Sequence, residues 1–293
     1  MSNEKKKWSK GKKIAVIIIC ILAFLLVAVL CAGFYALNWY CAPVDYEVVS
    51  ASDIIKDDTI MVAHRGFRAV APENTAPAFE EAGKAGYAAA ECDIYRSADG
   101  VWVVQHDKNT YRMMDKTANV EKTNYASGLD GFITDNGNNI EKYPNLEICT
   151  LEEYMQICDE YNMQAVIELK GDSNQEYYGE IIDMINQYPS VEVTFISFQF
   201  SDLQALRKVC DNELMYLVKE IKEEDIELAL TLDNCGIDFD GNNEKNYEND
   251  GEIIKKCQSA GLKTGAWTID DKAVMQKLLD LGVNMITTNC ITY

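Results

Sequence analysis

Histidine and positive charge are scarce in this chain. Its 293 residues include only two histidines, and 27 lysines and arginines stand against 47 aspartates and glutamates, for a formal net charge of −20. A chain this acidic repels the phosphates of nucleic acid, which excludes nucleic acid as an expected partner. Any anionic substrate therefore needs a local concentration of positive charge, such as a metal ion beside basic side chains.

The cysteines lack the spacing of a metal-binding motif. No two of them are arranged as C-x-x-C, so a thiolate zinc cluster is not expected. Two of the ten cysteines, Cys20 and Cys31, fall in an apolar N-terminal stretch. The other eight are expected either as buried thiols in the core or, in an oxidising compartment, as disulfides.

The N-terminus lacks the marks of a removable leader. No A-x-A cleavage motif is present, and no Leu-Ala-Gly-Cys lipid-attachment pattern precedes Cys31 or Cys41. Residues 1–13 instead form a basic arm with six lysines and one glutamate, and residues 14–37 are an uncharged apolar stretch of 24 residues. About 20 such residues cross a bilayer as a helix. We therefore expect a single-pass anchor in the cell membrane, followed by a linker at residues 38–58.

The lysines of the arm also predict an orientation. Lysine-rich flanks of membrane helices stay on the cytoplasmic side, so the N-terminus is expected in the cytoplasm. The remainder of the chain, which carries the catalytic residues proposed below, is then expected outside the cell.

Several short apolar runs end abruptly in charged residues, which is typical of strands that open into a polar pocket. The runs cover residues 60–66, 88–95, 101–107 and 164–172. The charged residues at their ends are His64, Glu91, Asp93, His106, Glu168 and Lys170. Because both histidines of the chain belong to this set, we expect the six residues to share one site.

Side chains two residues apart on a strand point to the same face, so Glu91 lies beside Asp93, and Glu168 beside Lys170. Ala88–Ala90 and Ile94 flank the first pair, which argues against a solvent-facing strand. Carboxylate oxygens suit a hard cation, Ca²⁺ or Mg²⁺, better than zinc. One divalent cation would also offset the repulsion among the three carboxylates.

The two histidines are then available for proton transfer. An imidazole with a pKa of roughly 6.5 donates or accepts a proton near neutral pH. Two of them on either side of one scissile bond would act as general acid and general base. The sequence alone does not say which histidine has which role.

These residues lie in motifs that resemble those of the glycerophosphodiester phosphodiesterase family. The motifs HRG, PENT, E-x-D, HD and E-x-K occur here in the family's order, at residues 64–66, 72–75, 91–93, 106–107 and 168–170. The resemblance runs from about Thr59 to the C-terminus and includes WTID at residues 267–270. It implies that Glu91, Asp93 and Glu168 bind the metal and that His64 and His106 are the catalytic acid and base.

Other motif residues have supporting roles in this interpretation. The resemblance implies that Arg65 and Lys170 contact the phosphate. Glu73 either supports the site or is only an early helix residue after Pro72, where its charge would favour the helix dipole. Trp267 is either a core residue or a platform for the apolar part of the substrate.

Strand-like and helix-like segments alternate beyond the linker, which predicts a parallel α/β fold. Eight strands in about 235 residues match a (β/α)₈ TIM barrel, in which active residues follow the carboxyl ends of the strands. The barrel is expected to span residues 59–293. Its strands are expected at residues 59–63, 88–94, 164–169, 191–198, 213–218, 235–239, 263–268 and 283–287.

Two segments depart from a plain barrel. Residues 108–149 are rich in Asn, Gly, Asp and Lys and predict an insertion after strand 2, over the active face. In the family a pattern HD-x-x-L-x-R-T-T begins this region, whereas here Arg112 is kept and Met113 and Met114 replace the threonines. The chain ends TTNCITY, with Asn289 where the family has aspartate and without a final helix. We predict that residues 45–58 cover that side of the barrel.

The expected reaction is metal-dependent hydrolysis of a glycerophosphodiester to glycerol 3-phosphate and an alcohol. Two alternatives stay open. One is cleavage of a lipid phosphodiester, as by a lysophospholipase D or a phosphatidylinositol phospholipase C, and the other is binding of a glycerophosphate polymer without cleavage. The expected partners are therefore a glycerophosphodiester or a lysolipid, together with the membrane.

Overall fold

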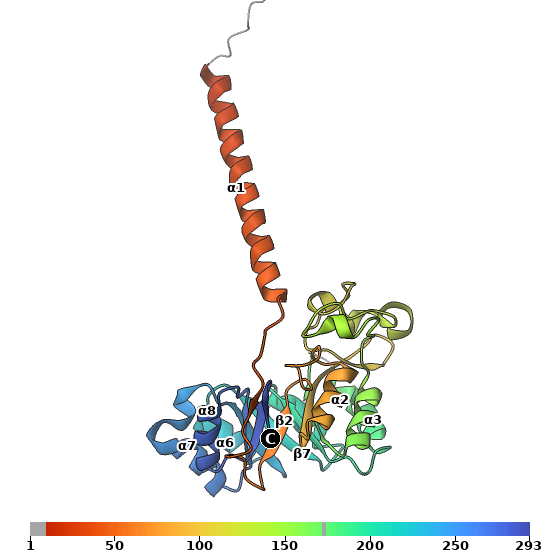
Figure 1. The fold of residues 1–293 in the computed structure, drawn as a ribbon, viewed down its shortest axis with the longest axis vertical. Helices are drawn as coiled ribbons and strands as arrows, with labels where there is room; N and C mark the ends of the chain where they lie inside the picture. Colours follow the sequence, from red (N-terminus) through yellow and green to blue (C-terminus); the bar gives the residue numbers. More distant parts are fainter. Residues whose placement is uncertain (1–9, 172–173) are drawn as a thin grey trace, which may run out of the picture. The chain divides into compact units, whose positions relative to one another are not determined.

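The computed structural model describes residues 10–171 and 174–293 and divides into two units, Met1–Ala42 and Pro43–Tyr293 (Figure 1). Residues 1–9, which make up most of the expected basic arm, lie outside the described residues. The first unit contains a single helix, and the second contains every motif discussed above.

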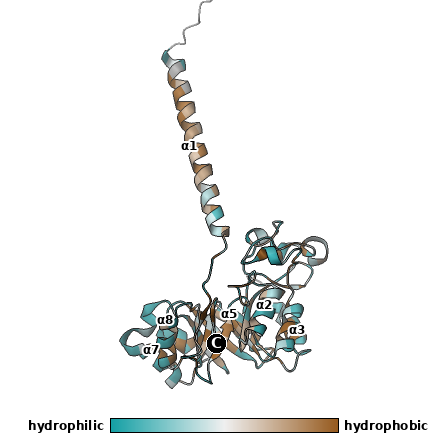
Figure 2. Ribbon diagram, in the orientation of Figure 1, coloured by the Kyte–Doolittle hydropathy of each residue, from teal (hydrophilic) through white to brown (hydrophobic). Residues whose placement is uncertain are grey.

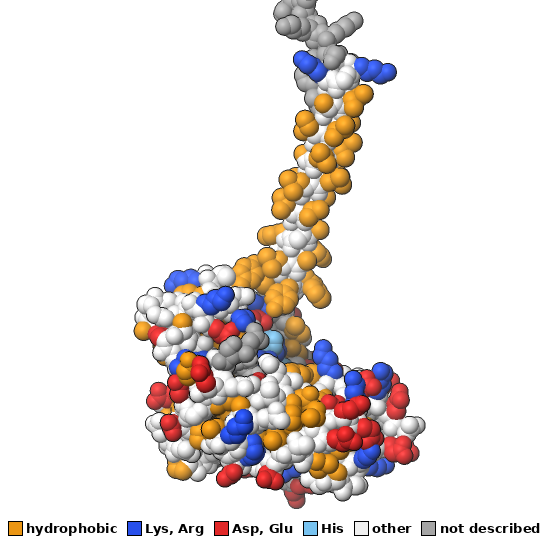
Figure 3. All heavy atoms as spheres, turned by 180° about the vertical axis from the view of Figure 1, so that it is seen from behind, with side chains coloured by type: hydrophobic (Ala, Val, Ile, Leu, Met, Phe, Trp, Pro, Cys, Tyr) orange, Lys and Arg blue, Asp and Glu red, His pale blue; other side chains and the backbone are white. Residues whose placement is uncertain are grey.

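Helix α1 (Lys10–Cys41) has 32 residues and contains the expected anchor at residues 14–37. Its most apolar window has a mean hydropathy of 3.5, so its length and composition allow it to cross a membrane. The ribbon of α1 is coloured hydrophobic over most of its length and pale to teal at its ends (Figure 2), and apolar side chains cover the helix in the space-filling view (Figure 3). Its large apolar side chains are exposed, Phe24 at 71% for example.

Within the described residues, eight parallel strands of the second unit close into a barrel, because β2 pairs with both β3 and β10. This confirms the predicted (β/α)₈ fold. A further strand, β4 (Trp102–Val104), is antiparallel to β3. The barrel strands are β2 (Ile60–Ala63), β3 (Ala89–Arg96), β5 (Gln164–Leu169), β6 (Val193–Ser197), β7 (Glu213–Val218), β8 (Cys235–Asp240), β9 (Thr264–Trp267) and β10 (Met285–Thr288).

Helices alternate with the strands, as the sequence pattern indicates. Their first turns are stabilised by side-chain caps: Thr150 accepts a hydrogen bond from the Glu153 amide, and Asp271 accepts from the amides of Ala273 and Val274. The helices are α2 (Ala76–Lys84), α3 (Leu151–Tyr161), α4 (Tyr178–Ile185), α5 (Phe200–Leu206), α6 (Glu223–Ala229), α7 (Glu248–Ser259) and α8 (Lys272–Asp280).

Two apolar regions stabilise the barrel, one on each face of the strands. Alternate strand residues such as Ile237 and Phe239 belong to the large core that includes the helices. Residues of the opposite parity fill the barrel interior with a smaller cluster. Its buried members are Val62, Ala89, Val166, Ile196, Met215, Leu217 and Met285. The polar site described below lies at one end of this cluster.

The insertion at residues 108–149 forms a set of loops beside α2 and α3 (Figure 1). It contains short helical turns, Thr110–Arg112, Val120–Lys122, Tyr125–Leu129 and Ile140–Lys142, joined by isolated bridges. Met113 and Met114 are buried in its own small core. This core also includes Tyr95 and Val103, so it joins the insertion to β3 and β4.

The segment that follows α1 pairs with the end of the chain. Strand β1 (Val49–Ser50) is parallel to β11 (Ile291–Thr292), and Ala51 is fully buried in the main core. The Tyr87 hydroxyl donates to the Ile291 carbonyl at 2.7 Å. Residues 43–58, expected as part of a linker, therefore belong to the barrel unit.

Six of the cysteines are free thiols buried in the barrel unit. Burial accounts for them as small apolar core residues, which is one of the two outcomes expected from the sequence. They are Cys92, Cys149, Cys158, Cys235, Cys257 and Cys290.

Candidate active site

The HRG motif forms a tight turn directly after β2. Arg65 and Gly66 both have positive φ, at 58° and 76°, and a Cβ on Gly66 would lie 2.6 Å from the backbone of Ala78. Glycine is therefore required at this position. The turn aims the Arg65 amide at Glu91, to which it donates at 2.8 Å.

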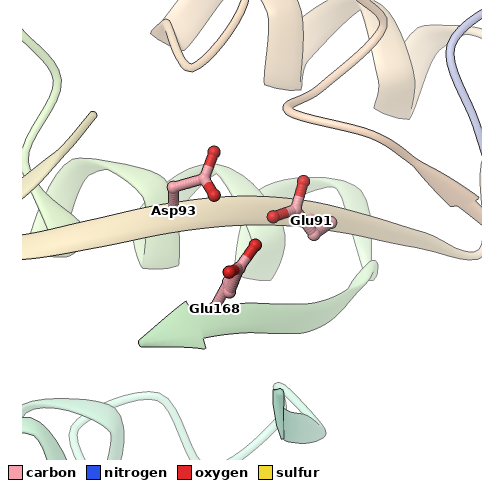
Figure 4. Close-up of side chains that lie close together, drawn as sticks. All are labelled: Glu91, Asp93 and Glu168. Carbon is pink, nitrogen blue, oxygen red and sulfur yellow. The ribbon is translucent and has the colours of Figure 1, made fainter. Parts of the chain in front are cut away.

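Three carboxylates converge from the middle of β3 and the carboxyl end of β5 (Figure 4). Glu91, Asp93 and Glu168 are buried, and each offers one oxygen within 4.8 Å of the others. Oxygens that share one Ca²⁺ or Mg²⁺ at about 2.0–2.6 Å lie no more than roughly 5 Å apart, so this group has the right dimensions. Oε1 of Glu91 is buried and has no hydrogen-bond partner among the described residues, which leaves it available to a cation.

The electrostatics of the three carboxylates also fit a cation. Burial, together with the charges of Asp93 and Glu168, raises the pKa of Glu91 well above its usual range. Burial and Asp93 raise the pKa of Glu168 to about 8. Burial would raise the pKa of Asp93 as well, but the positive charges of Lys170 and Arg65 hold it well below its usual range. The protein by itself thus stabilises the negative charge of Asp93 but not the negative charges of Glu91 and Glu168, which a bound cation would stabilise.

Basic side chains lie between the carboxylates. Nζ of Lys170 is 3.1 Å from Asp93 Oδ1 and 2.6 Å from Glu168 Oε1. Nε of Arg65 is 3.2 Å from Asp93 Oδ2, and the Asn74 amide donates to that same oxygen at 2.8 Å. Asn74 of the PENT motif therefore orients Asp93, a role that the sequence did not reveal.

His64 is held by a chain of two hydrogen bonds. The Asn289 side-chain nitrogen donates to Asp270 at 2.6 Å, so the Asn289 oxygen faces His64 Nδ1 at 2.7 Å. That oxygen can only accept, which places the proton on Nδ1 and leaves Nε2 as an acceptor. Burial, with Arg65 and Arg68, holds the pKa of His64 well below its usual value. Nε2 lies 4.0 Å from Glu91.

His106 has a carboxylate partner instead. Its Nδ1 is 2.9 Å from Asp107 Oδ1, and the guanidinium of Arg112 donates to Asp107 Oδ2 at 2.6 Å. This contact fixes the orientation of the His106 ring and turns its Nε2 away from Asp107. The insertion residue Arg112 therefore orients Asp107, which explains why the family pattern retains an arginine there.

Glu73 is at the centre of a buried ion-pair network and is not part of a helix, since α2 begins at Ala76. It pairs with Arg65 at 2.8 Å, with Arg112 at 2.5 Å and with Arg68. Burial alone would raise the pKa of Glu73, but the three guanidinium groups hold it well below its usual range. Glu73 thus ties the turn after β2 to the insertion.

Replacing Glu73 with glutamine is expected to lower the free energy of unfolding by about 3–5 kcal/mol, because it leaves buried guanidinium groups uncompensated. Folding lowers the pKa of Glu73. The loss of stability in the variant should therefore be complete at pH values above the unfolded-state pKa of about 4.3, and it should shrink as the pH falls below that value. Urea unfolding at pH 7 and pH 3.5 measures both effects. The matched control is Glu80→Gln, whose side chain is 45% exposed. Equal stability of wild type and Glu73→Gln at pH 7 would contradict this role.

A pocket of about 270 Å³ opens above these residues. Most of the predicted site residues line it: both histidines, Arg65, Glu91, Glu168, Lys170 and Trp267. Trp267 is half-buried, packs edge-to-face on Phe198 at 5.4 Å and also contacts the interior cluster. It therefore contributes to the core and lines the pocket, while its role as a substrate platform stays a prediction. Asp93 lies beneath the pocket with its side chain fully buried.

Six further residues line the pocket that the sequence motifs did not indicate: Ile196, Phe198, Leu217, Lys219, Asp238 and Thr287. Asp238 is unusual, because it is 1% exposed and neither carboxylate oxygen has a hydrogen-bond partner among the described residues. Burial, with the charge of Glu168, raises its pKa to about 8. The alternation Gly236, Asp238, Asp240 against Ile237 and Phe239 is the sequence signal that could have identified it.

Residues 64–292 match the glycerophosphoryl diester phosphodiesterase family. The chain belongs to this family. Over 252 residues it is 26% identical to a glycerophosphodiester phosphodiesterase of Caldanaerobacter subterraneus subsp. tengcongensis, covering 79% of this chain and 94% of the relative. As a member of the glycerophosphoryl diester phosphodiesterase family, the chain is a phosphoric diester hydrolase.

Solved structures agree with this assignment. An Oleispira antarctica phosphodiesterase in complex with the product sn-glycerol-3-phosphate has a TM-score of 0.71 and 26% identity, covering 82% of this chain and 95% of that one. A glycerophosphodiester phosphodiesterase from Parabacteroides distasonis has a TM-score of 0.64 and 25% identity, covering 80% and 94%. The barrel of this chain is thus a glycerophosphoryl diester phosphodiesterase barrel over nearly the full length of these relatives.

Proposed function

We propose that this enzyme hydrolyses glycerophosphodiesters to glycerol 3-phosphate and an alcohol, with one divalent cation, Ca²⁺ or Mg²⁺, as cofactor. The observation that carries the proposal is the convergence of Glu91, Asp93 and Glu168 below a pocket lined by both histidines. The product bound to the Oleispira antarctica relative supports the glycerol phosphate end of the substrate.

The three carboxylates would hold the cation. When bound, it would polarise the phosphoryl group and lower the pKa of a nearby hydroxyl. Arg65 and Lys170 line the pocket beside these carboxylates, where they would contact the phosphate and stabilise the charge that develops on its oxygens. The net charge of the chain makes such a local cationic centre necessary for an anionic substrate.

The hydrogen bonds of the two histidines favour different roles. His64 has its proton on Nδ1, toward Asn289, so its Nε2 would take a proton from the attacking oxygen. His106, paired with Asp107, would give a proton to the oxygen of the departing alcohol. The attacking oxygen would be the 2-hydroxyl of glycerol, which gives a cyclic phosphate that water then opens; direct attack by water would use the same two histidines.

The test is release of glycerol 3-phosphate from glycerophosphocholine and glycerophosphoethanolamine by the detergent-solubilised chain. It is measured with chelator and with added Ca²⁺ or Mg²⁺. We expect release with one of the cations and none with chelator. An enzyme that is inactive on both substrates with either cation would overturn the proposal.

A second candidate substrate is a lysolipid, cleaved at the same bond. The pocket has an apolar wall of Ile196, Phe198, Leu217 and Trp267, and the Phe198 side chain is 44% exposed. Such a wall suits an acyl chain as well as the apolar face of a small alcohol. Lysophosphatidylcholine in the same assay tests this candidate.

We further propose that α1 anchors the enzyme in the cell membrane, with its N-terminus in the cytoplasm and the barrel outside. The apolar helix and the lysines before it support this orientation. Protease added to intact cells should then digest residues 43–293. Digestion only after lysis would contradict it.

A further inference from the structure

The carboxyl group of Asp238, on β8, lines the pocket without a hydrogen-bond partner among the described residues. Asp238 is 1% exposed, and neither Oδ1 nor Oδ2 has a hydrogen-bond partner among the described residues. A buried polar group without a partner destabilises a fold by about 1–3 kcal/mol, so it calls for an explanation. None of the motifs discussed above includes Asp238.

Among the described residues, the strand neighbours of Asp238 offer its carboxyl group no hydrogen-bond partner. Its register neighbours are Leu217 on β7 and Gly265 on β9. Gly265 leaves room for the carboxyl, since a Cβ there would lie 2.8 Å from Oδ1. Leu217 belongs to the apolar interior cluster. A partner for Asp238 must therefore come from the pocket, and it must be polar.

The position of Asp238 also indicates which part of a substrate reaches it. Phe198 and Lys219 line the same pocket but are exposed, so they lie at its open side. Alcohols of different sizes must extend toward that side, because the pocket is only about 270 Å³. The small glycerol end is left for the buried side. Its phosphate is assigned above to the cation, Arg65 and Lys170, and its 2-hydroxyl to His64, which leaves its terminal hydroxyl.

We propose that Asp238 binds the terminal hydroxyl of the glycerol end of the substrate. The enzyme thereby selects glycerophosphodiesters whose terminal hydroxyl is free and discriminates against lysolipids that carry an acyl chain there. A site built to bind a hydroxyl rejects the analogue that lacks it, because the buried carboxyl then stays without a partner. This inference rests on the proposed function in one respect, that the substrate contains glycerol.

The test compares binding of two ligands by calorimetry, with the cation present and the full chain in detergent. One ligand is glycerol 3-phosphate. The other is propane-1,2-diol 1-phosphate, which differs from it only in lacking the terminal hydroxyl. Wild type is expected to bind the first about 10- to 100-fold more tightly. Asp238→Ala and Asp238→Leu should bring this ratio close to one, whereas Asp238→Asn, which keeps a donor and an acceptor, should retain much of it.

Stability supplies a second readout. Because Asp238 lacks a partner in the free protein, Asp238→Leu is expected to raise the thermal unfolding midpoint while the discrimination disappears. The matched control is Asp240→Ala on the same strand, whose carboxylate already accepts from the Asn242 amide at 3.0 Å. It should leave the binding ratio unchanged.

Three outcomes would overturn the inference. The first is that wild type binds the two ligands equally, as when a water satisfies Asp238. The second is that Asp238→Leu keeps the wild-type ratio of affinities. The third is that Asp238→Ala lowers the affinity for both ligands equally. Because binding needs no turnover, failure here is distinct from failure of the proposed function. Discrimination without release of glycerol 3-phosphate would contradict only the latter.

Discussion

Alanine in place of His106 is expected to lower kcat on glycerophosphocholine by about 10²–10⁴-fold, the usual size of a general acid's contribution. His106 lines the pocket, and Asp107, 2.9 Å from its Nδ1, orients its ring. Without it, the departing alcohol leaves as an unprotonated alkoxide. His64→Ala should be impaired to a similar extent, for loss of the base.

The leaving group separates these two roles. The glycerophosphodiester of 4-nitrophenol releases 4-nitrophenolate, a stable anion that needs no general acid. His106→Ala should therefore regain most of its activity on this substrate. His64→Ala should not, because the base acts on the attacking oxygen. Steady-state kinetics of both variants on both substrates make the comparison. Near-normal turnover of His106→Ala on glycerophosphocholine, or equal recovery of both variants, would contradict the assignment.

Glutamine in place of Glu91 is expected to have opposite effects with and without the cation. Folding raises the pKa of Glu91, so the charged form destabilises the metal-free protein, increasingly as the pH rises above the unfolded value of about 4.3. In chelator at pH 7, Glu91→Gln should therefore unfold at a higher temperature than wild type. With saturating Ca²⁺ or Mg²⁺ the order of the two unfolding temperatures should reverse. A bound ligand stabilises the folded state by an amount that grows with the logarithm of its affinity, and wild type should bind the cation more tightly.

The turnover of Glu91→Gln should depend on how well it binds the cation and not on its unfolding temperature. Loss of one of three carboxylates is expected to lower turnover by roughly 10²-fold or more at a fixed, limiting cation concentration, since neither a neutral amide nor the two remaining carboxylates replace its charge. Thermal unfolding and turnover are measured across a cation titration. The control, Glu223→Gln, changes a side chain that is 58% exposed. Equal stabilisation of Glu91→Gln and wild type by the cation would contradict a role for Glu91 as a ligand.

The barrel was predictable because its signals are local. Each strand is a short apolar run, and the site residues stand at the point where the run stops, as at Ala63–His64 and Leu169–Lys170. The positive φ of Gly66 in the turn after β2 is a local requirement for glycine. Such features depend on neighbouring residues and survive without knowledge of the fold.

The contacts that orient the site residues were harder to predict from the sequence. Asp270 and Asn289 meet only because β9 and β10 are adjacent in the closed barrel. The sequence left Glu73 open between a site role and an early helix residue after Pro72, but the extended backbone of Thr75 means that α2 begins only at Ala76. Asp238 was hidden because its outward neighbours Ile237 and Phe239 make the strand look like ordinary core. In each case the decisive partner is distant in sequence or absent from the chain.

The closure of the barrel makes the order of synthesis matter. Every charged group proposed for catalysis or metal binding has been made by residue 170, yet β2 obtains its second neighbour only when Met285–Thr288 leaves the ribosome. Until then, the nascent sheet keeps an open edge, and open edges pair with other chains. A translation product that stops before Met285 would contain the full set of catalytic side chains on a sheet that cannot close, and its fate would be aggregation or degradation.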